Sequence, residues 1–158
     1  MIEEGRKVIC LRTFSKIHGL AGLRVGYGYG SNELIDLLQR ARQPFNVNGI
    51  AQAAALGALE DSDWVEQCRR RNRDGLDQLT QGLEQLEIEY IPSHANFVLS
   101  KPGKGRQVFE DLQKLGIITR SLGPSLDAYL RISVGTEEEN HRLLTALEKQ
   151  RAVFGAKL

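Results

Sequence analysis

A short apolar run and a glycine-rich run near the start of the chain are typical of strands. Residues 8–11 are a short apolar run that ends in a polar cluster at residues 12–16. A second strand is predicted over residues 23–29, where glycine recurs at every second position from Gly26. Glycine inside a strand indicates close approach of another backbone segment or a bend. We therefore predict two strands, with glycine forming much of the second.

Helical spacing of apolar residues follows over the next part of the chain. Ser31 can cap a helix that begins its apolar stripe at Leu34 and ends before Pro44. Residues 51–59 predict a small, alanine-rich helix that suits tight packing, and we expect it to be buried. From Asp63 the apolar residues recur at spacings of three and four, which predicts one long helix to about residue 86.

After the long helix the sequence pattern changes, and it predicts short elements in the order β-β-α-β-β-α. The predicted strands are residues 87–91, 95–100, 117–120 and 129–134. Between the second and third strands lies a helix that Gly116 ends. Thr136 and Glu139 have the spacing of a capping box and open the last helix. The whole pattern predicts an α/β protein.

Composition and charge narrow the function classes. Of the 158 residues, 41% are hydrophobic and 26% charged, as in ordinary folded proteins, and the formal net charge is +1. Such a balance gives no basic field for nucleic acid, and the apolar runs are too short for a membrane span. The arginines at positions 69, 70, 71 and 73 lack interleaved aromatic residues, so we expect a solvated helix face or a bridge between domains. We predict neither a nucleic-acid nor a membrane partner.

The cysteine and histidine residues suggest neither a disulfide nor a metal site. Cys10 lies in a strand-like run and Cys68 in a helix-like run, so we expect buried free thiols in a reducing compartment, which favours the cytoplasm. The three histidines are scattered, without the spacing of paired metal ligands. The sequence therefore predicts no metal ion.

Lys16 is the first candidate for chemistry. It follows the first predicted strand and has hydroxyl groups nearby in Thr13 and Ser15, with a guanidinium at Arg24. Two hydroxyls and one guanidinium are groups that hold a phosphate monoester, and the small residues between 19 and 22 leave room for a ligand. A lysine amine beside a phosphate socket suits an aldehyde cofactor that carries a phosphate, and pyridoxal 5'-phosphate has both features.

Residues 13–16 (TFSK) and 19–27 (GLAGLRVGY) resemble the lysine signature of aspartate-aminotransferase-like enzymes of fold type I. The step from Lys16 to Arg24 matches that signature. The resemblance implies that Lys16 holds pyridoxal phosphate covalently and acts as the catalytic residue. It also implies that Thr13, Ser15 and Arg24 bind the phosphate of the cofactor.

Three further segments resemble the histidinol-phosphate aminotransferase family in particular. They are residues 42–48 (RQPFNVN), 90–99 (YIPSHANFVL) and 130–140 (LRISVGTEEEN). The resemblance implies transamination of histidinol phosphate with 2-oxoglutarate in histidine biosynthesis, giving imidazole acetol phosphate and glutamate. It places Arg131 and a second arginine, Arg120, at the anionic end of these small-molecule substrates, and it implies a homodimer in the full-length enzyme.

The same resemblance predicts the domain organisation. The chain begins shortly before Lys16, whereas the family's large domain begins far upstream, so we expect a C-terminal fragment. Residues 1–86 are then the last part of the large, mostly parallel pyridoxal-phosphate-binding domain, and residues 87–158 are the small α+β domain. Cofactor contacts made by the absent half are lost, and residues 121–128 depart from the family pattern. We expect the fragment alone to be inactive.

Two alternatives stay open at this point. The lysine signature is shared with pyridoxal-phosphate decarboxylases of amino-acid phosphates, such as threonine-phosphate decarboxylase. The expected fragment could also be a non-catalytic remnant.

Overall fold

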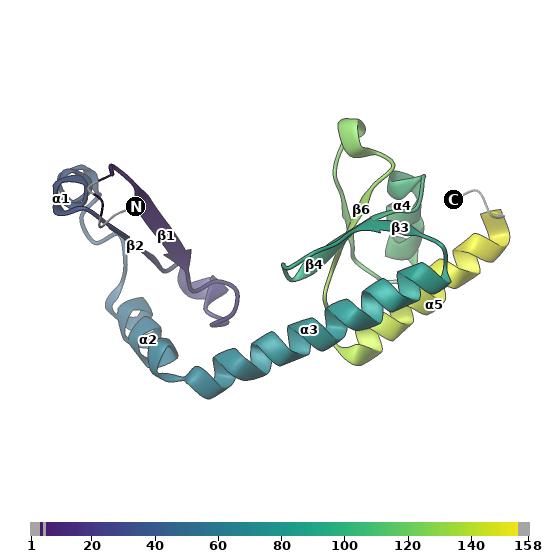
Figure 1. The fold of residues 1–158 in the computed structure, drawn as a ribbon, viewed down its shortest axis with the longest axis horizontal. Helices are drawn as coiled ribbons and strands as arrows, with labels where there is room; N and C mark the ends of the chain where they lie inside the picture. Colours follow the sequence, from purple (N-terminus) through teal and green to yellow (C-terminus); the bar gives the residue numbers. More distant parts are fainter. Residues whose placement is uncertain (1–3, 5, 155–158) are drawn as a thin grey trace. The chain divides into compact units, whose positions relative to one another are not determined.

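The computed structural model describes residue 4 and residues 6–154 of the chain, with side chains up to residue 150. The chain divides into two compact units, Met1–Arg69 and Arg70–Leu158. The first unit contains β1 (Ile9–Thr13), the 3-10 helix η1 (Ala21–Leu23), β2 (Gly26–Gly30), α1 (Asn32–Ala41) and α2 (Gly49–Glu60). Helix α3 (Ser62–Gln85) begins in the first unit and ends in the second (Figure 1).

The second unit continues with β3 (Glu89–Ile91), β4 (Phe97–Lys101), α4 (Gly105–Lys114), β5 (Arg120–Ser121), η2 (Pro124–Leu126), β6 (Leu130–Ser133) and α5 (Glu137–Phe154). The predicted order β-β-α-β-β-α is confirmed, and so is the α/β class. The boundary between the two compact units falls inside α3, and the domain boundary between residues 86 and 87 stays a prediction.

Strands β1 and β2 form an antiparallel pair in the first unit, with Thr13 opposite Gly26 and Ile9 opposite Gly30. An antiparallel pair needs only a short connection, whereas parallel neighbours need a crossover. The sheet of the whole large domain is predicted to be mostly parallel. The two strands in this unit, β1 and β2, are antiparallel neighbours and do not show that arrangement. A Cβ added at Gly26 would lie 2.6 Å from the carbonyl oxygen of Arg12, so the predicted close approach is present. The strand begins later than residue 23, because residues 21–23 form the 3-10 turn η1.

The core of the first unit is small. Phe14, Val25, Ala51 and Ala55 are its buried residues. The expectation that the alanine-rich helix is buried was therefore wrong for most of α2, because only one face of that helix packs against Phe14 and Val25. Cys10 is free but half-buried, as is Cys68, so the thiols are less buried than expected.

Helix α1 begins as predicted after Ser31, but the serine side chain makes no capping hydrogen bond. Helix α2 is capped instead by Asn48, whose side-chain oxygen accepts a 2.8 Å hydrogen bond from the Ala51 N–H. In α3 the arginines at 69, 70, 71 and 73 are exposed, which agrees with a solvated helix face.

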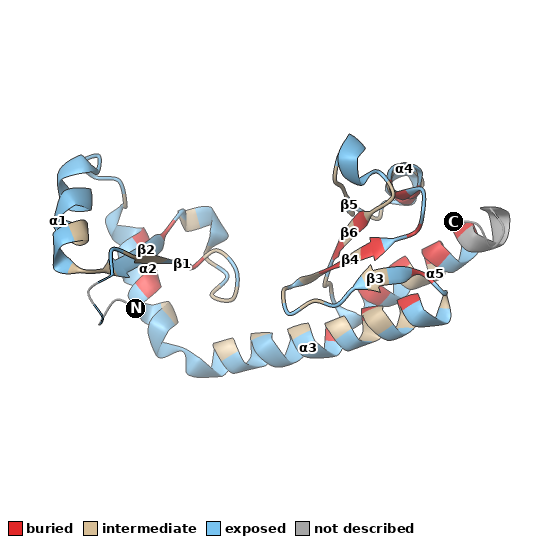
Figure 2. Cartoon of the chain, turned by 45° about the horizontal axis from the view of Figure 1, so that its top comes forward, coloured by how far each residue is buried: buried red, intermediate tan, exposed pale blue. Residues whose placement is uncertain are grey.

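The sheet of the second unit has the strand order β3-β4-β6-β5, and all its pairings are antiparallel. Side chains alternate between the two faces of a strand. Val98 is opposite Ile132, and both face a core that also contains Leu79, Leu112 and Leu147 from α3, α4 and α5. Figure 2 shows buried positions, in red, on the strands and helices of this unit. Arg131, one position along β6 from Ile132, must face the opposite side.

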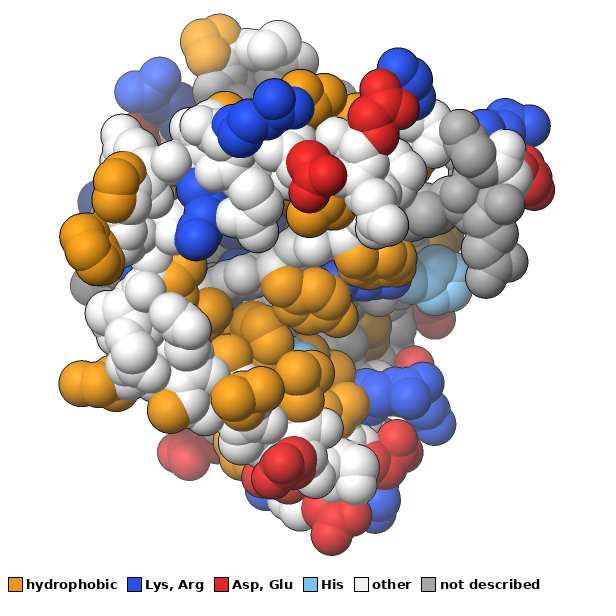
Figure 3. Space-filling view, turned by 90° about the vertical axis from the view of Figure 1, so that its left-hand side faces the viewer, with side chains coloured by type: hydrophobic (Ala, Val, Ile, Leu, Met, Phe, Trp, Pro, Cys, Tyr) orange, Lys and Arg blue, Asp and Glu red, His pale blue; other side chains and the backbone are white. Residues whose placement is uncertain are grey.

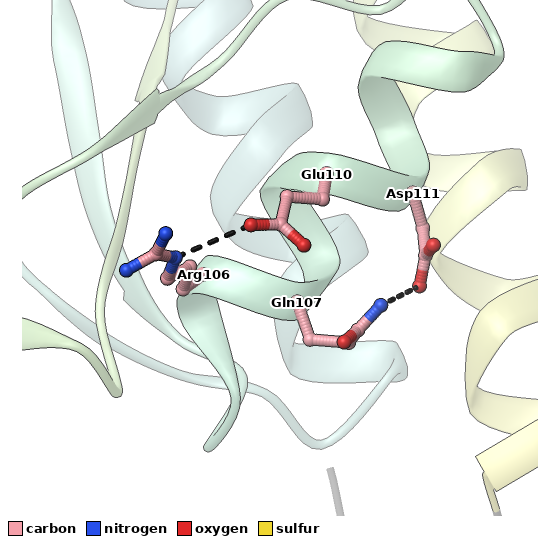
Figure 4. Close-up of polar contacts among 4 residues, drawn as sticks. All are labelled: Arg106, Gln107, Glu110 and Asp111. Carbon is pink, nitrogen blue, oxygen red and sulfur yellow. Dashed lines mark hydrogen bonds and ion pairs between the residues drawn. The ribbon is translucent and has the colours of Figure 1, made fainter.

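Polar side-chain contacts stabilise the surface of α4 and the start of α5. On the exposed side of α4, Arg106 pairs with Glu110, and the Gln107 amide donates to Asp111 (Figure 4). At the start of α5 the capping box is confirmed: Glu139 N–H donates to Thr136 Oγ1 at 3.2 Å, and Thr136 N–H donates to Glu139 Oε2 at 2.8 Å. Within the described part of the chain, no helix is long and apolar enough to cross a bilayer.

Candidate functional site

The turn that carries Lys16 begins where β1 ends. Phe14 fixes both ends of this turn: its N–H donates to the Val25 carbonyl at 3.2 Å, and its carbonyl accepts from the Leu20 N–H at 2.9 Å. Inside the turn, the Gly19 N–H donates to the Lys16 carbonyl at 2.9 Å. Phe14 is buried in the core, whereas Lys16 is exposed. A buried aromatic residue thus anchors a loop that presents an amine at the surface.

The predicted phosphate-binding residues lie on the two backbone segments that meet at the base of this turn. Thr13 pairs with Gly26, and the bond between Phe14 and Val25 continues the antiparallel register by one residue. Ser15 and Arg24 are the next residues along these two segments. Thr13 Oγ1 accepts a 3.1 Å hydrogen bond from the Ser15 N–H, which bends the backbone there.

Arg24 has an unusual backbone conformation. Its φ is 52°, in the left-handed region that residues other than glycine seldom adopt. Its Nη1 donates to the Ala21 carbonyl at 2.9 Å, which fixes one side of the guanidinium and leaves its other donors for a ligand. Strained backbone of this kind is found frequently at ligand-binding sites. By their chemistry, the hydroxyls of Thr13 and Ser15 and this guanidinium are donors that suit a phosphate monoester.

The two candidate substrate-binding arginines lie in the second unit. Arg120 of β5 is directly opposite Arg131 of β6, and Leu99 of β4 is opposite Arg131 on its other side. Side chains directly opposite each other in a sheet share a face and lie close together, so two cations are side by side. Like charges in this arrangement repel, and a bound anion would relieve the repulsion. The pair can accept a phosphate or a carboxylate.

Phe97 is a neighbour of Arg131 that sequence reasoning missed. The centre of the Arg131 guanidinium lies 5.1 Å from the centroid of the Phe97 ring, a cation–π contact. Arg131 Nε is buried without a hydrogen-bond partner among the described residues. The ring therefore orients a guanidinium that still has a free donor. The sequence does contain a signal, because Phe97 lies in a predicted strand. That signal points to Arg131 only when the pairing of the two strands is known.

The first unit also has a cavity of about 600 Å³ with partly apolar walls. Phe14, Tyr27, Phe45 and Leu56 are among the residues that line it, and Arg42 is its charged member. Figure 3 shows hydrophobic side chains gathered on the face of the molecule turned to the viewer. Phe14 thus packs against the core, lines this cavity and fixes the Lys16 turn.

Comparison with known proteins places nearly the whole chain in one family. The family model for aminotransferases of class I and II matches residues 1–147. A protein of Dechloromonas aromatica named histidinol-phosphate aminotransferase 1 is 51% identical over 149 residues, which are 94% of this chain and 41% of that protein. A protein of Akkermansia muciniphila named histidinol-phosphate aminotransferase is 45% identical over the same shares of both chains.

The fold agrees with the same assignment. The crystal structure of histidinol-phosphate aminotransferase from Sinorhizobium meliloti in complex with pyridoxal-5'-phosphate superposes with a TM-score of 0.85 and 28% sequence identity. That match covers 94% of this chain and 42% of the other. The chain thus spans less than half the length of these relatives.

Proposed function

Because this chain belongs to the aminotransferase family of classes I and II, we propose that it carries the cofactor-anchoring lysine and substrate-binding arginines of a pyridoxal-phosphate-dependent aminotransferase. The reaction we propose for the full-length enzyme is amino transfer between histidinol phosphate and 2-oxoglutarate in histidine biosynthesis. The names and identities of the relatives support this choice of substrate.

One observation supports the proposal for the cofactor site: the Phe14 N–H donates to the Val25 carbonyl, so the chain neighbours of these two residues, Ser15 and Arg24, lie at the base of the Lys16 turn. In this proposal Arg24 and the hydroxyls of Ser15 and Thr13 hold the phosphate, and Lys16 holds the cofactor covalently. Pyridoxal phosphate, when bound, withdraws electrons from the substrate carbon that bears the amino group. Lys16, once released, would take the proton from that carbon and deliver it to the carbon of the cofactor's former aldehyde group, so that the amino group stays with the cofactor.

The arginine pair supports an anionic substrate. Arg131 is held by Phe97 and lies opposite Arg120, so both guanidiniums can approach one dianionic phosphate or, in the second substrate, a carboxylate. Binding the common anionic end at the same place would let one site accept both substrates.

We further propose the arrangement of the full-length enzyme. Residues 1–86 would be the last part of the large domain and residues 87–158 the small domain. A homodimer is the proposed assembly, and the exposed hydrophobic side chains of the first unit support a covered surface there. The free state of Cys10 and Cys68 supports a reducing compartment, and we propose the cytoplasm.

A visible absorbance band tests the role of Lys16. The 158-residue chain, incubated with pyridoxal phosphate, should develop a band that is absent from Lys16→Ala. Lys7→Ala is the matched control, because Lys7 is a surface lysine of the same unit that pairs with Glu33. Arg24→Ala should require at least about tenfold more cofactor, since charge-assisted hydrogen bonds to the phosphate are lost. An equal band in Lys16→Ala would contradict the proposal.

A further inference from the structure

Trp64, the one tryptophan of the chain, contacts the turn that carries Lys16. Its indole N–H (Nε1) donates a 2.8 Å hydrogen bond to the carbonyl oxygen of Ile17, the residue that follows Lys16. The contact joins residues that are 47 positions apart in the chain. The indole also lies beside Gly19, since a Cβ added there would be 4.0 Å from Trp64 Cζ2. Trp64 thus touches the middle of the turn, whereas Phe14 fixes its ends.

The start of α3 holds the indole in place. Asp61 Oδ1 accepts a 2.9 Å hydrogen bond from the Trp64 N–H, as an N-cap side chain does. The Asp61 carbonyl accepts from the Val65 N–H at 3.4 Å, which continues the helix. Trp64 therefore extends from a capped helix end, and its position is defined by helix geometry more than by loop conformation.

The turn itself needs such support. Gly19 has a φ of 70°, so the turn depends on a residue with a wide choice of backbone conformations. Lys16 is exposed, and its long side chain has many rotamers. A lysine that must meet an aldehyde carbon gains from a fixed backbone, because each degree of freedom removed beforehand does not have to be lost on binding.

We propose that Trp64 is a positioning residue for Lys16: its indole N–H holds the Ile17 carbonyl and thereby fixes the backbone from which the lysine side chain extends. This inference deepens the proposed function and depends on the assigned role of Lys16. Trp64 contacts the turn and not the cofactor in this scheme, so it acts through Lys16.

A first measurement needs no cofactor. Trp64→Phe keeps an aromatic ring and removes the N–H donor. Amide hydrogen exchange of Gly19, whose N–H bonds to the Lys16 carbonyl, should become about two- to tenfold faster, the effect of losing one net hydrogen bond. Amides of β1 and β2 in the same spectrum are the internal control. Equal acceleration in the strands, or no change at Gly19, would overturn the proposal, because the indole would then only stabilise the unit.

A second measurement uses pyridoxal phosphate. The Lys16-dependent band of Trp64→Phe should need about two- to tenfold more cofactor for half-saturation than that of the unchanged chain. Tyr29→Phe is the matched control: it removes one hydroxyl from an exposed aromatic residue on β2 and should leave the half-saturation unchanged. In the unchanged chain, Trp64 fluorescence should be quenched as the band appears.

The two hypotheses fail in different ways. A missing Lys16-dependent band in the unchanged chain contradicts the proposed function. An unchanged half-saturation in Trp64→Phe, with the band present, contradicts the role of Trp64.

Discussion

The two units of this chain bury their hydrophobic residues to very different extents. Among the described residues, the core of the second unit contains eleven buried residues, whereas the core of the first contains four. The large hydrophobic side chains that stay exposed are concentrated in the first unit: Leu11, Tyr27, Tyr29, Leu37, Leu38, Phe45, Ile50, Leu56, Leu59 and Trp64. The second unit thus buries most of its large hydrophobic side chains in its own core, whereas the first unit leaves many of them exposed.

This difference bears on how the candidate residues of each unit are held. Arg131 and Arg120 extend from neighbouring strands whose opposite face is covered by helices, so a stable sheet fixes their spacing. Lys16 and Arg24 extend from a turn, and individual contacts from Phe14, Ala21 and Trp64 fix it. The arginine pair of the second unit therefore depends on a core, whereas Lys16 and Arg24 of the first unit depend on a few local contacts.

The largest expected effect is a difference in stability between the units. Each large side chain that is fully buried contributes about 1.5–3 kcal/mol, so the second unit should open with a free energy at least about 3 kcal/mol higher. This corresponds to roughly a hundredfold slower amide exchange in β4 and β6 than in β1 and β2. Exchange followed by NMR at low denaturant concentration measures it. Equal protection in both sheets would show that the uncovered apolar surface does not weaken the first unit.

A pair of glycine substitutions tests the packing behind that difference. In the second unit, a Cβ at Gly75 would overlap Val134 Cγ1 and lie 3.2 Å from the buried Asn140 amide nitrogen. Valine is stiff and Asn140 is hydrogen-bonded, so Gly75→Ala should cost about 1–3 kcal/mol in urea unfolding. In the first unit, a Cβ at Gly57 meets nothing within 4 Å. Gly57→Ala should stabilise α2 by about 0.5–1 kcal/mol, because alanine favours helix.

A stabilised Gly75→Ala variant would show that the contacts of α3 with Val134 and Asn140 are looser than the distances indicate. A destabilised Gly57→Ala variant would show that this face of α2 is in contact with protein in solution.

Local patterns allowed much of the fold to be predicted from the sequence. The capping box at Thr136 and Glu139 and the order of the last six elements depend on residues close in the chain. Burial of α2 was overestimated. An alanine-rich sequence is compatible with a core, but it does not show which face of the helix is covered. Strand residues 23–25 were wrongly assigned for a similar reason, since an apolar run does not show that Arg24 adopts a left-handed conformation.

The candidate site shows the same limit. Lys16 and Arg24 could be proposed because they belong to one short motif, and Arg120 and Arg131 because of a family resemblance. Phe97 and Trp64 could not, because their contacts depend on strand register and on where α3 begins. Contacts between residues distant in the chain are decided by tertiary packing, which local sequence patterns do not specify.

A smaller difference in stability between the two units is expected from their helix caps. Ser31 and Thr136 were both predicted as N-caps, but Thr136 alone of these two makes the side-chain bond. Thr136→Ala should therefore cost about 1 kcal/mol of stability, and Ser31→Ala should cost clearly less. Urea denaturation of both variants gives the comparison. A larger loss for Ser31→Ala would mean that its hydroxyl caps α1 in solution.

The smallest expected effect concerns charge on the surface of α4. The Lys114 ammonium donates to Asp111 at 2.7 Å and the Gln107 amide donates at 3.0 Å, and these hydrogen bonds hold the pKa of Asp111 below its usual value. A carboxyl group whose folded pKa is lowered stabilises the fold above its unfolded pKa of about 3.9, and that contribution is lost as the pH falls through the folded pKa. NMR titration should show the Asp111 pKa rising in Lys114→Ala, and rising less in Gln107→Ala.

Between pH 7 and pH 5 the Asp111 carboxyl stays ionised. Its titration should therefore not change the difference in amide exchange rate between the two units in this pH range. A larger rise in Gln107→Ala than in Lys114→Ala would show that the amide, and not the ammonium, dominates the shift. If lowering the pH to 5 removed the exchange difference, charged groups and not the eleven-residue core would have to explain the greater stability expected for the second unit.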